Sequence, residues 1–174
     1  KGIDSLQINH LNSGIKLLVN NPSEVGSDRI CNVVGANKIK SPAMIIDFGT
    51  ATTYDITNDE GDFIGGAISP GIDISADYLV NQAALLKDTA YNFPDLIIGK
   101  TTESNIQSGV MYGGLFSVMG MINAIKEELK NPNLDIIITG GFGKLISNKL
   151  KIKHEYIESL TMDGMLKIYS NLSA

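Results

Sequence analysis

The chain has 174 residues and a net charge of −5, with 43% hydrophobic and 19% charged residues. This composition supports a packed core of about one domain and excludes a disordered chain. The acidic balance argues against nucleic acid or an anionic membrane as the main partner, because either would favour a basic face. Cys31 is the only cysteine, which excludes an intramolecular disulfide and fits a reducing cytoplasm. We identify no apolar run of the roughly 18 to 20 residues that a membrane span requires.

Apolar spacing and turn formers predict alternating strands and helices along the chain. In the first half, the expected order is strand 15–19, helix 25–39, a three-stranded antiparallel meander of 43–46, 52–57 and 62–68, and helix 72–86. In the second half, it is helix 102–129, strand 135–139, helix 143–150 and helix 161–171. Residues 102–129 also fit two helices joined near Gly113-Gly114. The order predicts an α/β sheet flanked by helices.

The stretch "MIIDFGTATTYDI", residues 44–56, places Asp47 at the end of an apolar strand, followed by Gly49 and Thr50. A carboxylate and turn amides at one strand end can hold a cation that bridges phosphates, and Thr50 can donate a hydrogen bond to a phosphate oxygen. An acid that only caps a turn is the alternative that these residues leave open.

The stretch "NPSEVGSDRICN", residues 21–32, places Asp28 and Arg29 at the start of a predicted helix. An aspartate beside a pocket can accept a proton from a hydroxyl group, and an arginine can clamp a carboxylate. The spacing alone favours two solvated residues on a first helical turn.

Two further stretches carry weaker signals. Gly140 and Gly141 follow a predicted strand, where they would let a planar or phosphate-bearing ligand approach the backbone. Thr101 or Thr102 is expected to cap the long helix, and a capping threonine can also face a pocket. His10 and His154 are the only histidines, so nucleophilic triads and zinc sites have few candidate residues.

Five stretches occur together and in one order. They are "NPSEVGSDRICN", "MIIDFGTATTYDI", "GDFIGGAISPGI", "GKTTESNIQSG" and "TGGFGKLI". In this combination, from about Asn20 to Leu166, the chain resembles the type III pantothenate kinases. The resemblance implies the ribonuclease H-like fold of the acetate and sugar kinase, heat-shock ATPase and actin superfamily. It also implies a cytoplasmic homodimer that transfers the γ-phosphate of ATP to the hydroxyl of pantothenate, the first step of coenzyme A synthesis.

The resemblance assigns roles to the matching residues of this chain. Gly26, Ser27, Asp28 and Arg29 match the Gly-x-Asp-Arg stretch that binds pantothenate, with Asp28 as general base and Arg29 beside the substrate carboxylate. Thr102 matches a further substrate-binding position. Asp47 matches the ligand of a monovalent cation, potassium or ammonium. The residues implied to contact ATP, which can carry magnesium, are Gly49, Thr50, Gly140 and Gly141.

The chain departs from the family pattern at its start, because residues 1–20 contain no first strand with a Gly-Asn-Thr phosphate loop. We therefore expect the C-terminal two-thirds of such an enzyme, without the N-terminal half of the duplicated fold and with little or no activity alone. Residues 1–20 would be a remnant of the N-terminal domain and its connection, and 21–174 the C-terminal actin-like domain. A non-catalytic regulatory protein of this fold, binding a nucleotide or pantothenate, and another kinase of the superfamily are the alternatives.

Overall fold

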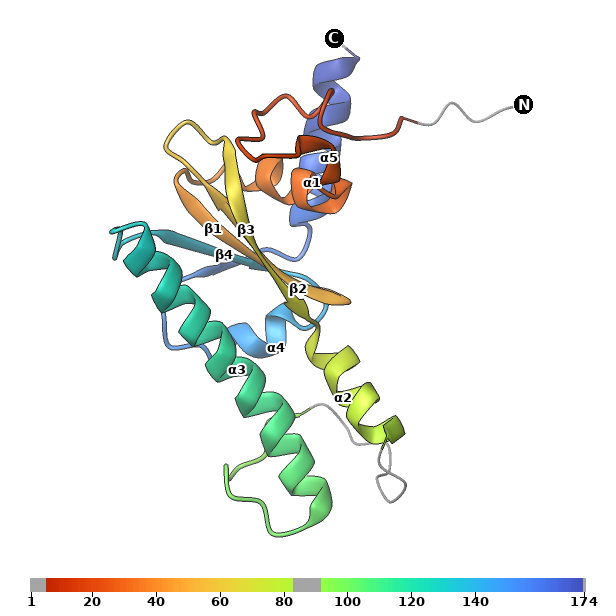
Figure 1. Cartoon of the computed structure of the whole chain (residues 1–174), viewed down its shortest axis with the longest axis vertical. Helices are drawn as coiled ribbons and strands as arrows, with labels where there is room; N and C mark the ends of the chain where they lie inside the picture. Colours follow the sequence, from red (N-terminus) through yellow and green to blue (C-terminus); the bar gives the residue numbers. More distant parts are fainter. Residues whose placement is uncertain (1–5, 83–91, 174) are drawn as a thin grey trace, which may run out of the picture.

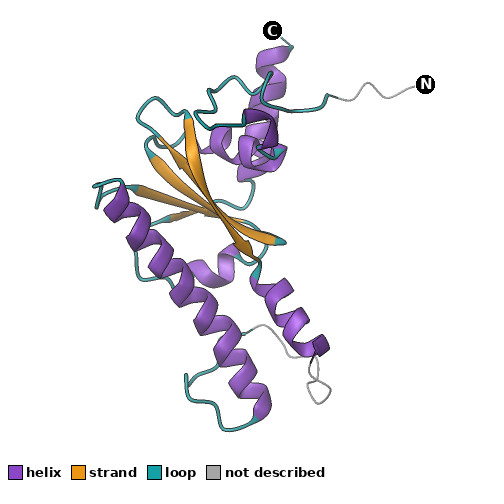
Figure 2. Ribbon diagram, in the orientation of Figure 1, coloured by secondary structure: helices purple, strands orange, loops and turns teal. Residues whose placement is uncertain are grey.

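The computed structural model describes residues 6–82 and 92–173 and centres on a mixed five-stranded sheet in the order β3-β2-β1-β4-β5 (Figures 1 and 2). The strands are β1 (Ala43–Phe48), β2 (Ala51–Thr57), β3 (Phe63–Pro70), β4 (Asp135–Thr139) and β5 (Glu155–Tyr156). The meander β1-β2-β3 is antiparallel, whereas β4 lies parallel to β1 and β5 parallel to β4. This order and these directions are those of the ribonuclease H-like fold, and they confirm the expected mixed α/β sheet.

Helices cover both faces of the sheet (Figure 1). They are α1 (Ser27–Ala36), α2 (Ile72–Gln82), α3 (Thr102–Glu128), α4 (Gly143–Ser147) and α5 (Leu160–Leu172), and a single 3₁₀ turn (Pro22–Glu24) precedes α1. Helices α1 and α5 pack on one face, while α3 and α4 pack on the other.

The alternation of side chains along β1 divides the core into two layers. Ala43 and Ile45 pack with Val33 of α1 and Leu160 of α5. The alternate residues of the strand pack against α3 on the other face: Met44, Ile46 and Phe48. Because successive side chains of a strand point to opposite faces, Asp47 lies on the side of Ala43 and Ile45. The acid at the end of β1 therefore faces α1.

Most of the predicted elements are confirmed, and the differences are local. The prediction of a strand at 15–19 is wrong, because this segment forms only a single β-bridge, between Leu17 and Phe63. The short strand β5 was not expected, because two residues give no periodic pattern. The expected end of the second helix at Leu86 and residues 1–5 lie outside the described residues. The domain boundary near residue 20 stays a prediction.

Helix α3 is continuous through Gly113-Gly114, which settles the choice between one helix and two. Thr101 caps it: the hydroxyl of Thr101 accepts from the Ser104 backbone N–H at 3.1 Å, and the Ser104 hydroxyl accepts from the Thr101 N–H at 3.0 Å. Contrary to the sequence-based expectation, α3 is long and apolar enough to cross a membrane by length and composition. The core helix of a soluble protein passes the same test, so this finding alone decides nothing.

Candidate functional site

The start of α1 presents the Gly-x-Asp-Arg stretch to solvent. Gly26 is the N-terminal cap residue, and Asp28 lies in the first turn, where the helix dipole favours a negative charge. A side chain at Gly26 would collide with the Asp28 carboxylate, so the glycine lets this carboxylate fold back over the helix start. Asp28 is exposed to solvent.

Asp47 is half-buried at the end of β1 and is tied to α1. Its Oδ2 accepts a hydrogen bond from the Asn32 amide at 2.7 Å. Burial raises the pKa of the Asp47 carboxyl, the Asn32 hydrogen bond opposes this rise, and the negative charge of Asp28 adds to it. Asp28 and Asp47, which were predicted from separate stretches, therefore lie within electrostatic reach of each other.

Two turns meet at the end of β1. Asp47 is paired with Thr139 of β4, and the Phe142 N–H donates to the Phe48 carbonyl at 3.3 Å. This contact brings the turn that contains Gly49 and Thr50 beside the turn that contains Gly140 and Gly141. The structure thus places the four residues assigned to ATP at one edge of the sheet, next to Asp47.

Gly140 is fitted closely against Asp47. It adopts a φ of +89°, a conformation that side chains disfavour, and a methyl group here would collide with Asp47 Oδ1. Asn32 holds one carboxylate oxygen, so the other, Oδ1, faces the glycine turns. Gly141 beyond it has open space where a side chain would project.

The chemistry of these donors fits a single monovalent cation. A carboxylate oxygen and backbone carbonyls are ligands that hard cations take. Within residues 6–82 and 92–173, no group of three or more His, Cys, Asp or Glu side chains is placed to hold a metal ion. A site with one carboxylate suits a weakly charged ion better than a divalent ion held by protein alone.

Arg29 has a protein partner of its own. Its Nε and Nη2 both reach Asp55 Oδ1 of β2, at 2.7 and 2.6 Å, and its guanidinium stacks over the Phe63 ring at 5.2 Å. Asp55 is fully buried and also accepts from the Thr53 hydroxyl at 3.2 Å. Arg29 is therefore fixed by an ion pair, and its expected contact with a substrate carboxylate would use the remaining N–H groups.

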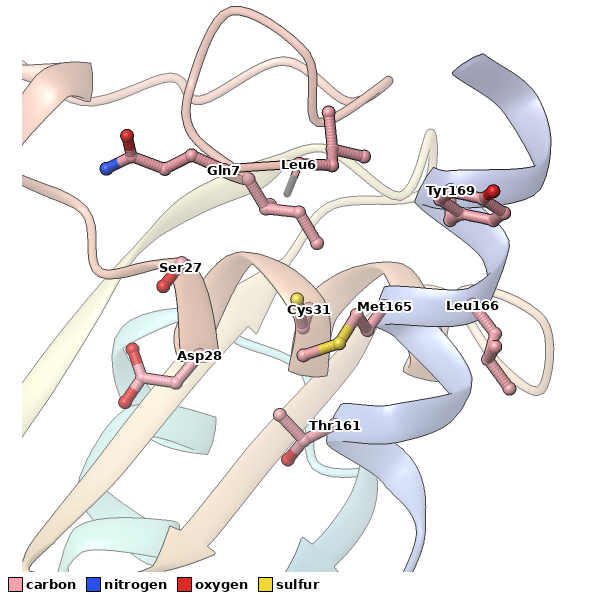
Figure 3. A pocket seen from close by; sticks show the side chains of 10 residues that line it. Leu6, Gln7, Ser27, Asp28, Cys31, Thr161, Met165, Leu166 and Tyr169 are labelled. Carbon is pink, nitrogen blue, oxygen red and sulfur yellow. The ribbon is translucent and has the colours of Figure 1, made fainter. Parts of the chain in front are cut away.

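A cavity of about 570 Å³ opens beside α1 (Figure 3). Ser27 and Asp28 lie at one end, Met165, Leu166 and Tyr169 of α5 form an apolar wall, and Leu6 and Gln7 lie above. Thr161 completes the side toward the sheet. This volume and the mixture of apolar walls with a few polar groups are typical of a site for a small molecule.

Thr102 is not brought to this cavity. It lies at the first turn of α3 and lines a separate cavity of about 800 Å³ between α2, α3 and the sheet, together with Tyr54 and Tyr78. Figure 1 shows that α3 begins at the end of the molecule remote from α1. Within one chain, Thr102 and Asp28 therefore do not share a site.

Three residues of this region were missed from the sequence. Asn32 and Thr161 are linked to Asp47, and Asp55 is linked to Arg29. Asn32 follows Asp28 by four residues, which places both on one helix face, so this spacing was an available signal. No comparable signal marked Thr161 or the burial of Asp55.

Comparison with known proteins gives this geometry a family. The family model for type III pantothenate kinase matches residues 2–124. The type III pantothenate kinase of Agathobacter rectalis is 39% identical over 160 residues, which cover 91% of this chain and 62% of that protein. That of Paramagnetospirillum magneticum is 40% identical over 157 residues, covering 90% and 60%. The chain thus spans about 60% of the length of these curated relatives.

A solved structure shares the fold. It is described as a conserved Baf family transcriptional activator from Campylobacter jejuni and is similar with a TM-score of 0.66 at 21% identity. The match covers 94% of this chain and 71% of that one, and at this identity it supports the fold alone. The family match and the two curated relatives decide the assignment: the chain belongs to the type III pantothenate kinase family.

Proposed function

We propose that the full-length protein phosphorylates pantothenate with ATP. The observation that carries this proposal is the position of Asp28. This carboxylate borders the cavity on one side and is within electrostatic reach of Asp47, which adjoins the glycine turns, on the other. Asp28 would therefore lie between an alcohol in the cavity and the strand ends proposed to bind phosphate.

In this proposal, Asp28 accepts the proton of the pantothenate hydroxyl. A carboxylate is a weak base, but in a loose phosphoryl-transfer transition state the attacking hydroxyl becomes acidic late. Gly26 and Ser27 border the substrate, and the N–H groups of Arg29 that Asp55 leaves open would bind the pantothenate carboxylate. The main contribution of the protein is to align the hydroxyl with the phosphoryl group.

The glycine turns would hold ATP, with Thr50 and Gly49 on one side and Gly140 and Gly141 on the other. Asp47 would bind potassium or ammonium, and magnesium would arrive with the nucleotide. A bound cation would supply positive charge that offsets the charge of the phosphates. The described residues contribute one side of this ATP site. We propose that the remaining contacts come from the part of the family's sequence that this chain does not cover. We also propose that the enzyme works in the cytoplasm.

The decisive experiment measures ATP-dependent phosphorylation of pantothenate by the full-length protein, with and without potassium. Asp28→Asn should lower kcat by about 10²- to 10⁴-fold while pantothenate still binds, because removal of a general base affects the chemical step. Asp59→Asn, at an exposed position in the β2–β3 turn, is the matched control and should leave kcat unchanged. A wild-type protein without activity under either condition would refute the proposed function and would favour the regulatory alternative.

A homodimer belongs to the proposal, and Thr102 gives it a test. Since Thr102 and Asp28 line different cavities of one chain, a contact of Thr102 with the same pantothenate requires a second copy. A mixture of Asp28→Asn and Thr102→Val chains would then form dimers in which one site has both native residues. Restored activity on mixing supports this arrangement, and the absence of restoration argues that Thr102 does not serve the site of Asp28.

A further inference from the structure

Three side chains from three elements form one hydrogen-bonded chain beneath the cavity. Thr161 Oγ1 of α5 donates to Asn32 Oδ1 of α1 at 2.6 Å, and Asn32 Nδ2 donates to Asp47 Oδ2 of β1 at 2.7 Å. Asn32 is fully buried, so water does not replace these partners. A buried amide without hydrogen-bond partners would destabilise the fold, so Asn32 requires both Thr161 and Asp47.

The direction of each hydrogen bond in this chain is fixed by chemistry. An ionised carboxylate only accepts, so Asn32 must present its NH₂ group to Asp47. The amide oxygen of Asn32 then faces Thr161, and the threonine hydroxyl must donate. Thr161 therefore selects the orientation of the Asn32 amide, and Asn32 selects which oxygen of Asp47 stays free.

The two helices that carry Asn32 and Thr161 cannot slide easily against each other. A side chain at Gly164 of α5 would overlap the Cys31 carbonyl of α1, so the backbones are in direct contact one turn beyond Thr161. Leu160, the residue before Thr161, is fully buried in the core that α1 and the sheet share. The donor and the acceptor are thus held by rigid packing.

The chain of hydrogen bonds also joins two parts of the proposed site. Thr161 lines the cavity that Asp28 borders, while Asp47 Oδ1 faces Gly140 at the strand ends. Asn32 lies one helical turn beyond Asp28 and between these two regions. A displacement of Thr161 in the cavity would therefore act through Asn32 on the position of the Asp47 carboxylate.

We propose that Asn32 and Thr161 are positioning residues that fix the Asp47 carboxylate for a monovalent cation. The proposal deepens the proposed function and rests on it, because the cation is part of the proposed kinase site. Asn32 holds Oδ2, which leaves Oδ1 directed at the glycine turns. Thr161 acts through Asn32 and does not touch the cation.

The test compares wild type, Thr161→Val, Thr161→Ser and Asn32→Ala in the full-length protein. Valine keeps the shape of threonine and its cavity-facing methyl group but removes the donor, whereas serine keeps the donor. The half-saturating potassium concentration for activity should rise by about five- to tenfold in Thr161→Val, the range expected when a hydrogen bond to a buried group is lost. It should rise further in Asn32→Ala and return close to the wild-type value in Thr161→Ser. Because Thr161 also lines the cavity, the KM for pantothenate is measured in the same variants, which separates an effect on the cavity from an effect on potassium.

A second readout does not depend on turnover. The melting temperature is measured with ATP present, in potassium chloride and in tetramethylammonium chloride at equal ionic strength. The wild type should gain stability from potassium, and Thr161→Val should gain clearly less at the same potassium concentration. If the wild type lacks kinase activity but shows this potassium gain, the proposed function fails and the positioning proposal stands on the melting data.

Three outcomes would overturn the proposal. One is a folded Thr161→Val variant whose half-saturating potassium concentration and potassium-dependent melting shift both match the wild type. Another is a wild-type protein that shows no response to potassium in either measurement, because Asp47 would then have no cation to be positioned for. The third is a general loss of stability in Thr161→Val that is the same in both salts, with unchanged potassium activation.

Discussion

Asp55 offers a sharp test of the electrostatics beneath α1. Its carboxylate is fully buried on β2 and paired with Arg29 at 2.6 Å. Burial raises the pKa of Asp55 from 3.8 to about 6, although the charge of Arg29 and hydrogen bonds from Arg29 and Thr53 oppose the rise, and the charge of Asp28 adds to it. The substitution Asp55→Asn keeps the shape and removes the ionisation.

The sign and size of the effect follow from linkage. The folded state binds the proton of Asp55 more tightly than the unfolded chain, so this contribution to stability is fully present below about pH 4 and is lost as pH rises through about 6. A pKa that rises from 3.8 to about 6 corresponds to about 3 kcal/mol in the free energy of unfolding. Between pH 4 and pH 7, the wild type should therefore lose most of this contribution, about 2 kcal/mol, relative to Asp55→Asn.

The assay is urea unfolding of both proteins at a series of pH values from 4 to 7.5. The other groups that titrate in this range cancel in the difference between the two proteins. Near pH 4, Asp55 of the wild type is protonated, so neither protein has a charge opposite Arg29, and the attraction of Arg29 for the ionised carboxylate is already contained in the pKa of about 6. A difference that does not change with pH would refute the reasoning. A wild type that gains relative to the variant as pH rises would show that the charge of Arg29 outweighs burial.

Two further predictions concern single residues. Gly140→Ala should destabilise the fold by more than about 1 to 2 kcal/mol, since a positive φ costs that much for alanine and the methyl group also meets Asp47 Oδ1. Urea unfolding measures this loss. The control is Gly141→Ala, because a side chain at Gly141 would project into open space. Thr101→Ala should lower the free energy of unfolding by about 1 kcal/mol through loss of the helix cap, whereas Thr102→Ala, outside the cap, should cost less. Equal losses in the two threonine variants would contradict the assignment of the cap.

The order of elements could be predicted from the sequence because it depends on local patterns. A short continuous apolar run marked β1, and the glycine and polar turns before and after β2 set the ends of that strand. The site was predicted only in pieces. Asp47 and Gly140 were identified as separate strand ends, and nothing in their own stretches showed that β1 and β4 are parallel neighbours. That pairing is what places both strand ends at one edge of the sheet.

Thr102 was assigned to the substrate site from the sequence, but the structure places it at a different cavity from Asp28. Its stretch was assigned to the substrate by family likeness and to a helix cap by its residue type, and both assignments depend on sequence alone. The length of α3 decides its position: a continuous helix rises 1.5 Å per residue, so 27 residues carry the first turn about 40 Å from the last. Once the later turns of α3 pack against the sheet, Thr102 is held at the remote end of the molecule.

Asp55 explains why a buried partner is harder to predict than an exposed base. In the strand "ATTYDIT", alternation predicts that Thr53 and Asp55 share one face while Tyr54 and Ile56 share the other. An acid at such a position is normally read as the solvent side of a half-buried sheet. Here that side is covered by α1, and the arginine that makes its burial tolerable comes from 26 residues earlier in the chain. Because Arg29 adjoins Asp28, the ion pair that fixes α1 to β2 also fixes the start of the helix that carries the proposed base, so core packing and site geometry depend on the same contact.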